Sequence, residues 1–116
     1  MARGDDIPSD IRKRIDRCKA ELATLGVVLR GSVTRRYMPC GKPGCKCMAD
    51  QPVLHGPYYQ WTSKVEGKTR TVRLTKDQAV VHQQWVDNAR RLRRILARWE
   101  AAGEAAAKNI QKISSR

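Results

Sequence analysis

The chain has 116 residues and a formal net charge of +13, with 24 Lys or Arg against 11 Asp or Glu. This excess predicts a polyanionic partner, most often nucleic acid, and the alternatives are an acidic protein partner or a basic surface without a specific partner. No apolar run approaches 18 residues and the N-terminus lacks an apolar segment, so we expect no membrane span, no signal peptide and a cytoplasmic location.

The first predicted element is a helix over residues 9–26, with Gly26 at its stop position. Its apolar stripe has 4-3-4-3 spacing and consists of Ile11, Ile15, Cys18, Leu22 and Leu25. Cys18 is therefore expected to be a core residue rather than a ligand. A strand is predicted to begin near Val28 or Ser32, and a loop rich in Cys, His, Gly and Pro occupies residues 39–56.

A β-hairpin is predicted next, over residues 57–75, with Glu66-Gly67 as its turn. This turn pairs Val65 with Lys68 and fixes which side chains share a face of the sheet. The apolar face then carries Tyr59, Trp61, Val72 and Leu74. The opposite face is polar and basic, and carries Tyr58, Gln60, Thr62, Lys64, Thr69, Thr71 and Arg73.

A long helix is predicted over residues 76–113, opened by a capping box from Thr75 to Gln78. Gly103 and neighbouring alanines weaken the helix, so we expect a firm helix to about residue 102. The tail beyond it is expected to self-associate, to dock on a protein partner or to stay mobile. The predicted apolar stripe of this helix is Trp85, Ala89, Leu92, Leu96 and Trp99.

These elements predict an α+β fold in one domain over residues 1–116. It has an N-terminal helix, a three-stranded antiparallel sheet module over residues 28–75 with the Cys/His loop between strands 1 and 2, and a long C-terminal helix. The first helix is expected to lie antiparallel against the long helix through its own apolar stripe.

The Cys/His loop has the spacing C-x4-C-x-C-x7-H and supplies four candidate metal ligands, Cys40, Cys45, Cys47 and His55. Glycines and a proline between them favour the tight turns in which zinc ligands occur. The hypothesis is one structural Zn²⁺ bound by all four, which leaves no open position. Another metal, a redox role and coincidence are the alternatives. A Cys45–Cys47 disulfide would close a strained ring, and Cys40 as a nucleophile lacks a third catalytic partner.

The polar sheet face is the predicted nucleic-acid interface, since a sheet can enter the major groove and present alternating side chains to base edges. Arg35 or Arg36 would join it from the first strand, depending on the register of that strand. Tyr58 could stack on an exposed base of a single strand. A second basic group on the long helix consists of the arginines from Arg90 to Arg94 together with Arg98, and Arg90, Arg94 and Arg98 share one face. This group follows a phosphate backbone or pairs with Asp16 or Glu21 of the first helix.

The segments RGSVTRRYMPCGKPGCKC, HGPYYQWTSKVEGKTRTVRL and TKDQAVVHQQWVDNARRLRRIL lie within residues 30–96. They resemble a group of small bacterial and phage proteins that share a CGKxxCxC…HGPYY core followed by a hairpin and a helix. The order of strand, hairpin and helix also resembles the arm-site DNA-binding domains of tyrosine recombinases and the related plant AP2-type domains. That resemblance implies a three-stranded sheet in the major groove. This sequence departs from it by inserting the Cys/His loop.

The function expected from the sequence is a zinc-stabilised nucleic-acid-binding protein, with DNA favoured over RNA, that serves a phage or mobile element as an accessory or regulator. The alternative is a small adaptor or inhibitor that binds an acidic protein, with zinc purely structural. We do not expect an enzyme, because the sequence has no phosphate loop and no paired carboxylates in a shared context.

Overall fold

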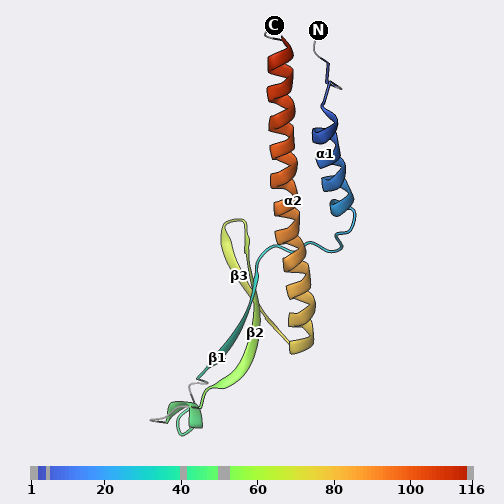
Figure 1. Cartoon of the computed structure of the whole chain (residues 1–116). Coiled ribbons are helices and arrows are strands. Elements are labelled where there is room, and N and C mark those ends of the chain that lie inside the picture. Colours follow the sequence, from blue (N-terminus) through green and yellow to red (C-terminus); the bar gives the residue numbers. More distant parts are fainter. Residues whose placement is uncertain (1–2, 5, 40–41, 50–52, 115–116) are drawn as a thin grey trace. The chain divides into compact units, whose positions relative to one another are not determined.

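The structure is a computed structural model that describes residues 3–4, 6–39, 42–49 and 53–114 (Figure 1). Its elements are helix α1 (Ser9–Leu22), strand β1 (Ser32–Met38), a short 3₁₀ helix η1 (Lys46–Met48), strands β2 (His55–Val65) and β3 (Lys68–Leu74), and helix α2 (Lys76–Ser114). The predicted α+β fold is therefore confirmed. The chain divides into two compact units, residues 1–28 with 88–116, and residues 29–87.

The helical unit consists of α1 and the part of α2 from Asn88 onward. Hydrogen bonds link the N-terminal segment to α2, and the bonded residue in α2 comes earlier in the sequence as the bonded residue in the N-terminal segment comes later. The two helices are therefore antiparallel, as expected. The bonded pairs are Asp6 with Asn109, Glu21 with Arg98, Thr24 with Arg91 and Val27 with Asn88. The buried core of this unit consists of Ile11, Cys18, Ala89, Ile95 and Ala102.

The first helix ends earlier than predicted, whereas α2 covers the predicted residues 76–113 and one further residue. Helix α1 ends at Leu22, four residues before Gly26. Thr24 there donates its hydroxyl to the Glu21 carbonyl at 2.7 Å, and its own N–H bonds to the same carbonyl. A local side-chain bond of this kind competes with continuation of the helix. Helix α2 runs through Gly103 to Ser114, because a single glycine costs a helix only about 1 kcal/mol.

The predicted apolar stripe of α2 is wrong in phase beyond Ala89. Leu96 is 41% exposed, whereas Ile95 and Ala102 are buried. Residues 76–87 of α2 pack within the sheet unit and residues 88–114 pack against α1. One stripe with a single phase cannot describe both segments, because each segment is buried by a different partner.

The sheet unit contains three antiparallel strands in the order β1-β2-β3. The hairpin register is as predicted, with Val65 opposite Lys68 and Trp61 opposite Val72. Its turn places Glu66 and Gly67 at positive φ values of 52° and 78°, as a two-residue turn between right-twisted strands requires. The apolar face packs on the first turns of α2, where Leu74 and Ala79 are buried.

The start of α2 is fixed by a reciprocal cap. The Gln78 N–H donates to Thr75 Oγ1 at 3.2 Å, and the Thr75 N–H donates to Gln78 Oε1 at 2.9 Å. This is the predicted capping box, and it fixes where the helix begins after β3. Across the described residues, no helix has an apolar stretch of the length that a bilayer crossing needs.

Gly31 marks the entry into β1 and is packed directly against β2. Its φ is +117°, and a Cβ atom there would lie 2.7 Å from Trp61 Nε1 and would also strike the Thr62 carbonyl. We therefore expect Gly31→Ala to lower the free energy of unfolding by about 2–4 kcal/mol, through both backbone strain and steric overlap. Urea denaturation measures this directly.

Gly44→Ala is the matched control for that substitution, because Gly44 also has a positive φ, of +78°, but nothing lies within 4 Å of its Cβ position. Gly44→Ala should lower the free energy of unfolding by about 1 kcal/mol, because only the backbone strain contributes and no steric overlap is added. Equal losses in the two variants would show that contact with β2 is unimportant.

Candidate metal centre and nucleic-acid interface

The loop between β1 and β2 folds back so that Cys45 and Cys47 lie close to His55, the first residue of β2. A turn through Gly44, at a φ of +78°, is closed by the Cys45 N–H donating to the Lys42 carbonyl at 3.2 Å. The Val53 N–H then donates to the Lys46 carbonyl at 3.1 Å. These two bonds return the chain to η1 and place His55 opposite Cys45.

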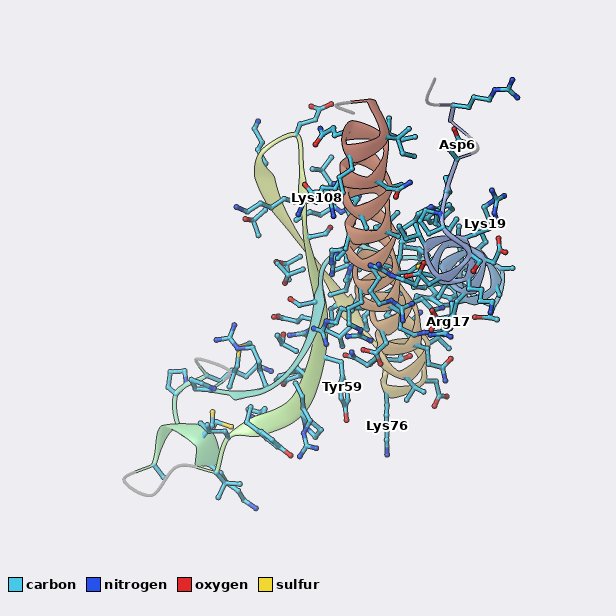
Figure 2. All side chains as sticks on the ribbon, turned by 45° about the horizontal axis from the view of Figure 1, so that its top comes forward. Asp6, Arg17, Lys19, Tyr59, Lys76 and Lys108 are labelled. Atoms are coloured by element: carbon cyan, nitrogen blue, oxygen red, sulfur yellow. The ribbon has the colours of Figure 1, made fainter. Side chains whose placement is uncertain are left out.

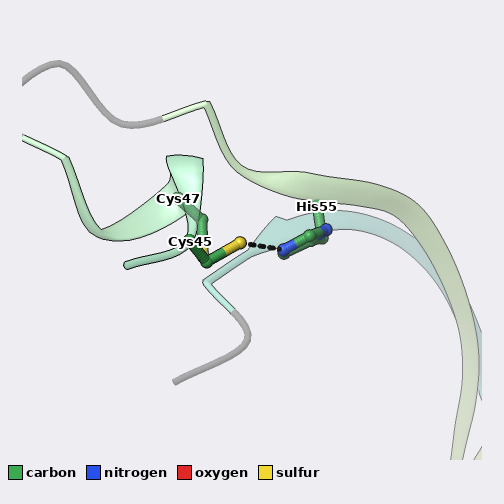
Figure 3. Close-up of side chains that lie close together, drawn as sticks. All are labelled: Cys45, Cys47 and His55. Atoms are coloured by element: carbon green, nitrogen blue, oxygen red, sulfur yellow. Dashed lines mark hydrogen bonds between the residues drawn. The ribbon is translucent and has the colours of Figure 1, made fainter. Parts of the chain in front are cut away.

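Cys45, Cys47 and His55 form a compact cluster (Figure 3). Cys45 Sγ lies 3.0 Å from His55 Nε2, and the three ligand atoms all lie within 4.8 Å of one another. Tetrahedral zinc holds sulfur and nitrogen ligands at about 2.0–2.3 Å, which places the ligand atoms about 3.3–3.8 Å apart. The cluster could therefore hold a metal ion with small side-chain adjustments.

The three clustered residues differ in exposure. The Cys47 side chain is only 3% exposed, whereas Cys45 and His55 are half-buried. Cys45 and Cys47 are both thiols, as expected for ligands. Cys40, the fourth predicted ligand, lies outside the described residues. The predicted core role of Cys18 is confirmed, because it is buried in the helical unit.

The sheet anchors this cluster through the pairing of Met38 with His55. The register shifts between Arg36 and Met38, and Gly56 stands at this irregularity with a φ of +137°. A Cβ atom on Gly56 would lie 2.8 Å from the Arg36 carbonyl, so only glycine fits where the strands approach. The cluster is thus attached directly to the end of the β1–β2 pair.

One face of the sheet carries the residues predicted to contact nucleic acid, and we call it the polar face. The register of β1 pairs Arg36 with Tyr58 and Thr34 with Gln60, so Arg36 joins this face and Arg35 points to the opposite one. The complete polar face is Ser32, Thr34, Arg36, Tyr58, Gln60, Thr62, Lys64, Thr69, Thr71 and Arg73. Ser32 and Thr34 were missed because the sequence does not determine the register of β1.

The polar face is positively charged. The three strands contain six Lys or Arg residues and no Asp or Glu. Three of the six, Arg36, Lys64 and Arg73, lie on the polar face and are exposed. On the central strand, Tyr58, Gln60 and Thr62 of this face are half-buried between their neighbours, whereas Lys64 beside the hairpin turn is exposed. The exposed parts of this face are therefore its outer strands and Lys64 beside the hairpin turn.

Two side-chain contacts join neighbouring strands on the polar face. The Arg73 guanidinium lies 4.4 Å from the centroid of the Tyr58 ring, as in a cation–π pair. The hydroxyls of Thr62 and Thr71 are 3.4 Å apart on neighbouring strands. The stacked guanidinium covers one face of the Tyr58 ring, so only the other ring face remains for the predicted stacking on a base. Stacking also limits the conformations of Arg73, which favours directional hydrogen bonds.

Arg35 lies on the opposite face and belongs to a different environment. It donates to the Tyr37 hydroxyl at 2.8 Å, and this hydrogen bond is the main cause that raises the pKa of its guanidinium. Arg35 also lines a cleft of about 430 Å³ beside Val33, Tyr59, Lys76 and Val80. Figure 2 shows Tyr59 on the sheet and Lys76 at the start of α2. The proposed role of Arg35 on the polar face therefore does not apply.

The second predicted basic group lies in the helical unit, where Arg90 and Arg94 are exposed on α2. The expected ion pair with α1 is made by Arg98 of this group, which pairs with Glu21. This hydrogen bond is the main cause that raises the pKa of Arg98.

A sequence profile of a protein family matches residues 8–84, which is well over half of the chain. The chain belongs to the family described as Domain of unknown function (DUF6788). The DUF6788 match includes α1, the Cys/His loop, the whole sheet and the first turns of α2. No curated protein and no solved structure matches the chain.

Proposed function

We propose that this protein is a zinc-stabilised nucleic-acid-binding module with an accessory or regulatory role, and that its preferred ligand is duplex DNA. The observation that carries the proposal is the polar face, an exposed sheet surface with arginine, lysine, glutamine and threonine side chains and no carboxylates in its strands. Such a surface attracts a polyanion and also offers groups that donate to base edges.

The dimensions of the sheet suit the major groove of DNA. Neighbouring strands are about 4.8 Å apart, so three strands span about 10 Å between the outer backbones. The major groove is about 12 Å wide. A sheet that lies in the groove brings its exposed outer strands, β1 and β3, close to the two phosphate backbones. This arrangement supports Arg36, on β1, as a phosphate contact at the rim. Lys64 lies on the central strand, beyond the Ser32–Thr62 pair at which β1 begins and beside the hairpin turn, and we propose it as a phosphate contact at that end of the sheet.

Base contacts are proposed for Arg73 and Gln60, which are directly opposite each other on β3 and β2. A guanidinium donates two parallel bonds to guanine, and a glutamine amide both donates to and accepts from adenine. The hydroxyls of Thr69 and Thr71 suit phosphates, and their methyl groups suit thymine. The sheet thus offers both backbone and base contacts on one surface.

Zinc is the proposed metal because two thiolates and an imidazole are the ligand types that it prefers. The protein has no Phe and aromatic residues make up 5% of it, so its supply of core material is small. A metal at the end of the β1–β2 pair would compensate by holding the loop to the sheet. Lys42 and Lys46 add positive charge beside the cluster, which would partly offset the formal charge of −1 of a zinc centre with three cysteines and one histidine.

The experiment compares Lys64→Ala with Lys68→Ala by fluorescence anisotropy on a 20-base-pair duplex over a range of salt concentrations. Both lysines are exposed and adjoin the same turn, but the register places them on opposite faces. We expect Lys64→Ala to weaken binding to every sequence and to lower the salt slope by about one unit, and Lys68→Ala to change the slope little.

Arg73→Ala tests base recognition in the same assay. It should weaken the free energy of binding to a preferred site by about 1–3 kcal/mol and change binding to random DNA little. Single-stranded DNA and duplex RNA are measured in parallel, and duplex DNA should bind most tightly. The proposal fails if Lys64→Ala and Arg73→Ala bind DNA like the parent protein while circular dichroism shows an intact fold.

A further inference from the structure

A second positively charged surface lies in the helical unit, along one side of the contact between α1 and α2. A cleft of about 200 Å³ is lined by Arg14, Arg17, Cys18, Arg98 and Ala101. A neighbouring cleft of about 250 Å³ is lined by Glu21, Arg91, Arg94, Ile95 and Arg98. Arg98 lines both, so the clefts adjoin. We call this surface the arginine groove and define it by Arg14, Arg17, Arg91, Arg94 and Arg98.

Charge in the arginine groove is not balanced. Five guanidinium groups line it, and Glu21 is the only carboxylate among its lining residues. Arg98 pairs with Glu21, and Arg91 donates to the Thr24 hydroxyl at 3.1 Å. Arg14, Arg17 and Arg94 have no ion-pair or hydrogen-bond partner within the described part of the chain. Three exposed guanidinium groups, contributed by both helices, therefore face one groove without a counter-charge.

We propose that the arginine groove binds phosphate groups of a nucleic-acid backbone, independently of base sequence. The proposal rests on the proposed function for the identity of the ligand and adds a second contact surface to it. Guanidinium groups match phosphate oxygens with two parallel hydrogen bonds and remain charged at every physiological pH. Apart from Glu21, which pairs with Arg98, the other lining residues are Cys18, Ile95 and Ala101, which offer no group for reading a base edge.

The spacing of the arginines supports a linear phosphate chain as the ligand. Arg91, Arg94 and Arg98 are three and four residues apart on α2, so they form a row of about 10 Å along one helix. Arg14 and Arg17 are three residues apart on α1 and face the same groove. Successive phosphates of one strand can therefore contact cations from both helices.

The experiment uses two triple variants with the same change in net charge. The groove variant is Arg14→Gln, Arg17→Gln and Arg94→Gln, which leaves the Arg98–Glu21 pair intact. The control variant is Lys13→Gln, Lys19→Gln and Arg93→Gln, whose residues are exposed and line neither cleft. Figure 2 shows Arg17 and Lys19 on different sides of α1. Glutamine has nearly the same helix propensity as Arg and Lys, so both variants should keep the fold.

We expect the groove variant to lower the salt slope of duplex DNA binding by about two to three units and to weaken binding on the order of 100-fold at 0.1 M salt. The loss should be equal on random DNA and on any preferred site. The control variant should change the slope by less than about one unit. Equal effects of the two triple variants would overturn the proposal, and so would polyglutamate that competes as well as DNA of equal charge.

A third protein, Lys64→Ala with Arg73→Ala, separates this inference from the proposed function. If this sheet variant loses binding and the groove variant behaves like its control, the inference is overturned and the sheet proposal stands. If the groove variant loses binding and the sheet variant binds like the parent protein, the groove is supported and recognition by the sheet is overturned. Losses in both variants support two separate contact surfaces.

Discussion

We expect Cys47→Ser to lose the proposed zinc ion, with zinc measured by mass spectrometry falling from one ion per chain to near zero. Cys47 has the most buried side chain of the cluster, and serine is a much weaker ligand for zinc than a thiolate. We expect the zinc affinity to fall by at least about 100-fold. Because formation of a structural zinc site is coupled to folding, the sheet unit should also lose stability, with an earlier thermal transition than the parent protein.

Cys18→Ala is the control, because it removes a buried thiol from the helical unit and leaves the cluster unchanged. It should keep one zinc per chain. Zinc binding by the parent protein should weaken on acidification, because protons compete for the thiolates and the imidazole. Full zinc content in purified Cys47→Ser protein would contradict the assignment of this residue as a ligand. The same measurement on Cys40→Ser tests the fourth ligand.

Trp61→Ala should lower the free energy of unfolding by about 3–5 kcal/mol, which is the typical cost of removing a large packed aromatic ring. Trp61 lies on the central strand between Val33 and Val72. Its Nε1 donates to the Arg30 carbonyl at 2.9 Å, and its ring lies 4.9 Å from the Arg70 guanidinium and 5.6 Å from the His82 ring. The side chain therefore joins the sheet, the segment before β1 and the start of α2.

Two further variants separate these contributions in chemical denaturation experiments. Trp61→Phe keeps an aromatic ring but removes the hydrogen bond to Arg30, so it should cost about 1–2 kcal/mol. Val72→Ala, on the neighbouring strand and 39% exposed, should cost less than about 1 kcal/mol. A Trp61→Ala protein within about 1 kcal/mol of the parent would show that the ring does not hold the sheet unit together.

Local sequence signals predicted the parts of the fold that depend on neighbouring residues. The Glu66-Gly67 turn fixed the register of the hairpin, since a two-residue turn leaves one pairing of the flanking strands. The Thr75–Gln78 capping box fixed the start of α2. Close spacing likewise predicted that Cys45, Cys47 and His55 would lie together, because a short loop with glycine and proline has few ways to fold.

Features that depend on tertiary contacts were not predictable in the same way. The choice between Arg35 and Arg36 depends on how β1 pairs with β2 across the Cys/His loop, and on the irregularity at Gly56. The phase of α2 depends on which partner buries each segment, so Leu96 was wrongly placed in the core. The arginine groove depends on the packing of two helices that are far apart in sequence.

The order β1-β2-β3 leaves the sheet with two open edges, since neither β1 nor β3 has an outer neighbour among the described residues. An open edge invites a strand from another copy of the chain, and charged side chains on edge strands discourage that pairing. Five of the six cationic strand residues lie on β1 and β3. Two of these five, Arg36 and Arg73, are also proposed to contact DNA, so we expect their removal to favour edge-to-edge pairing as well as to weaken binding. Charge-removing variants should be checked for solubility before a loss of binding is interpreted.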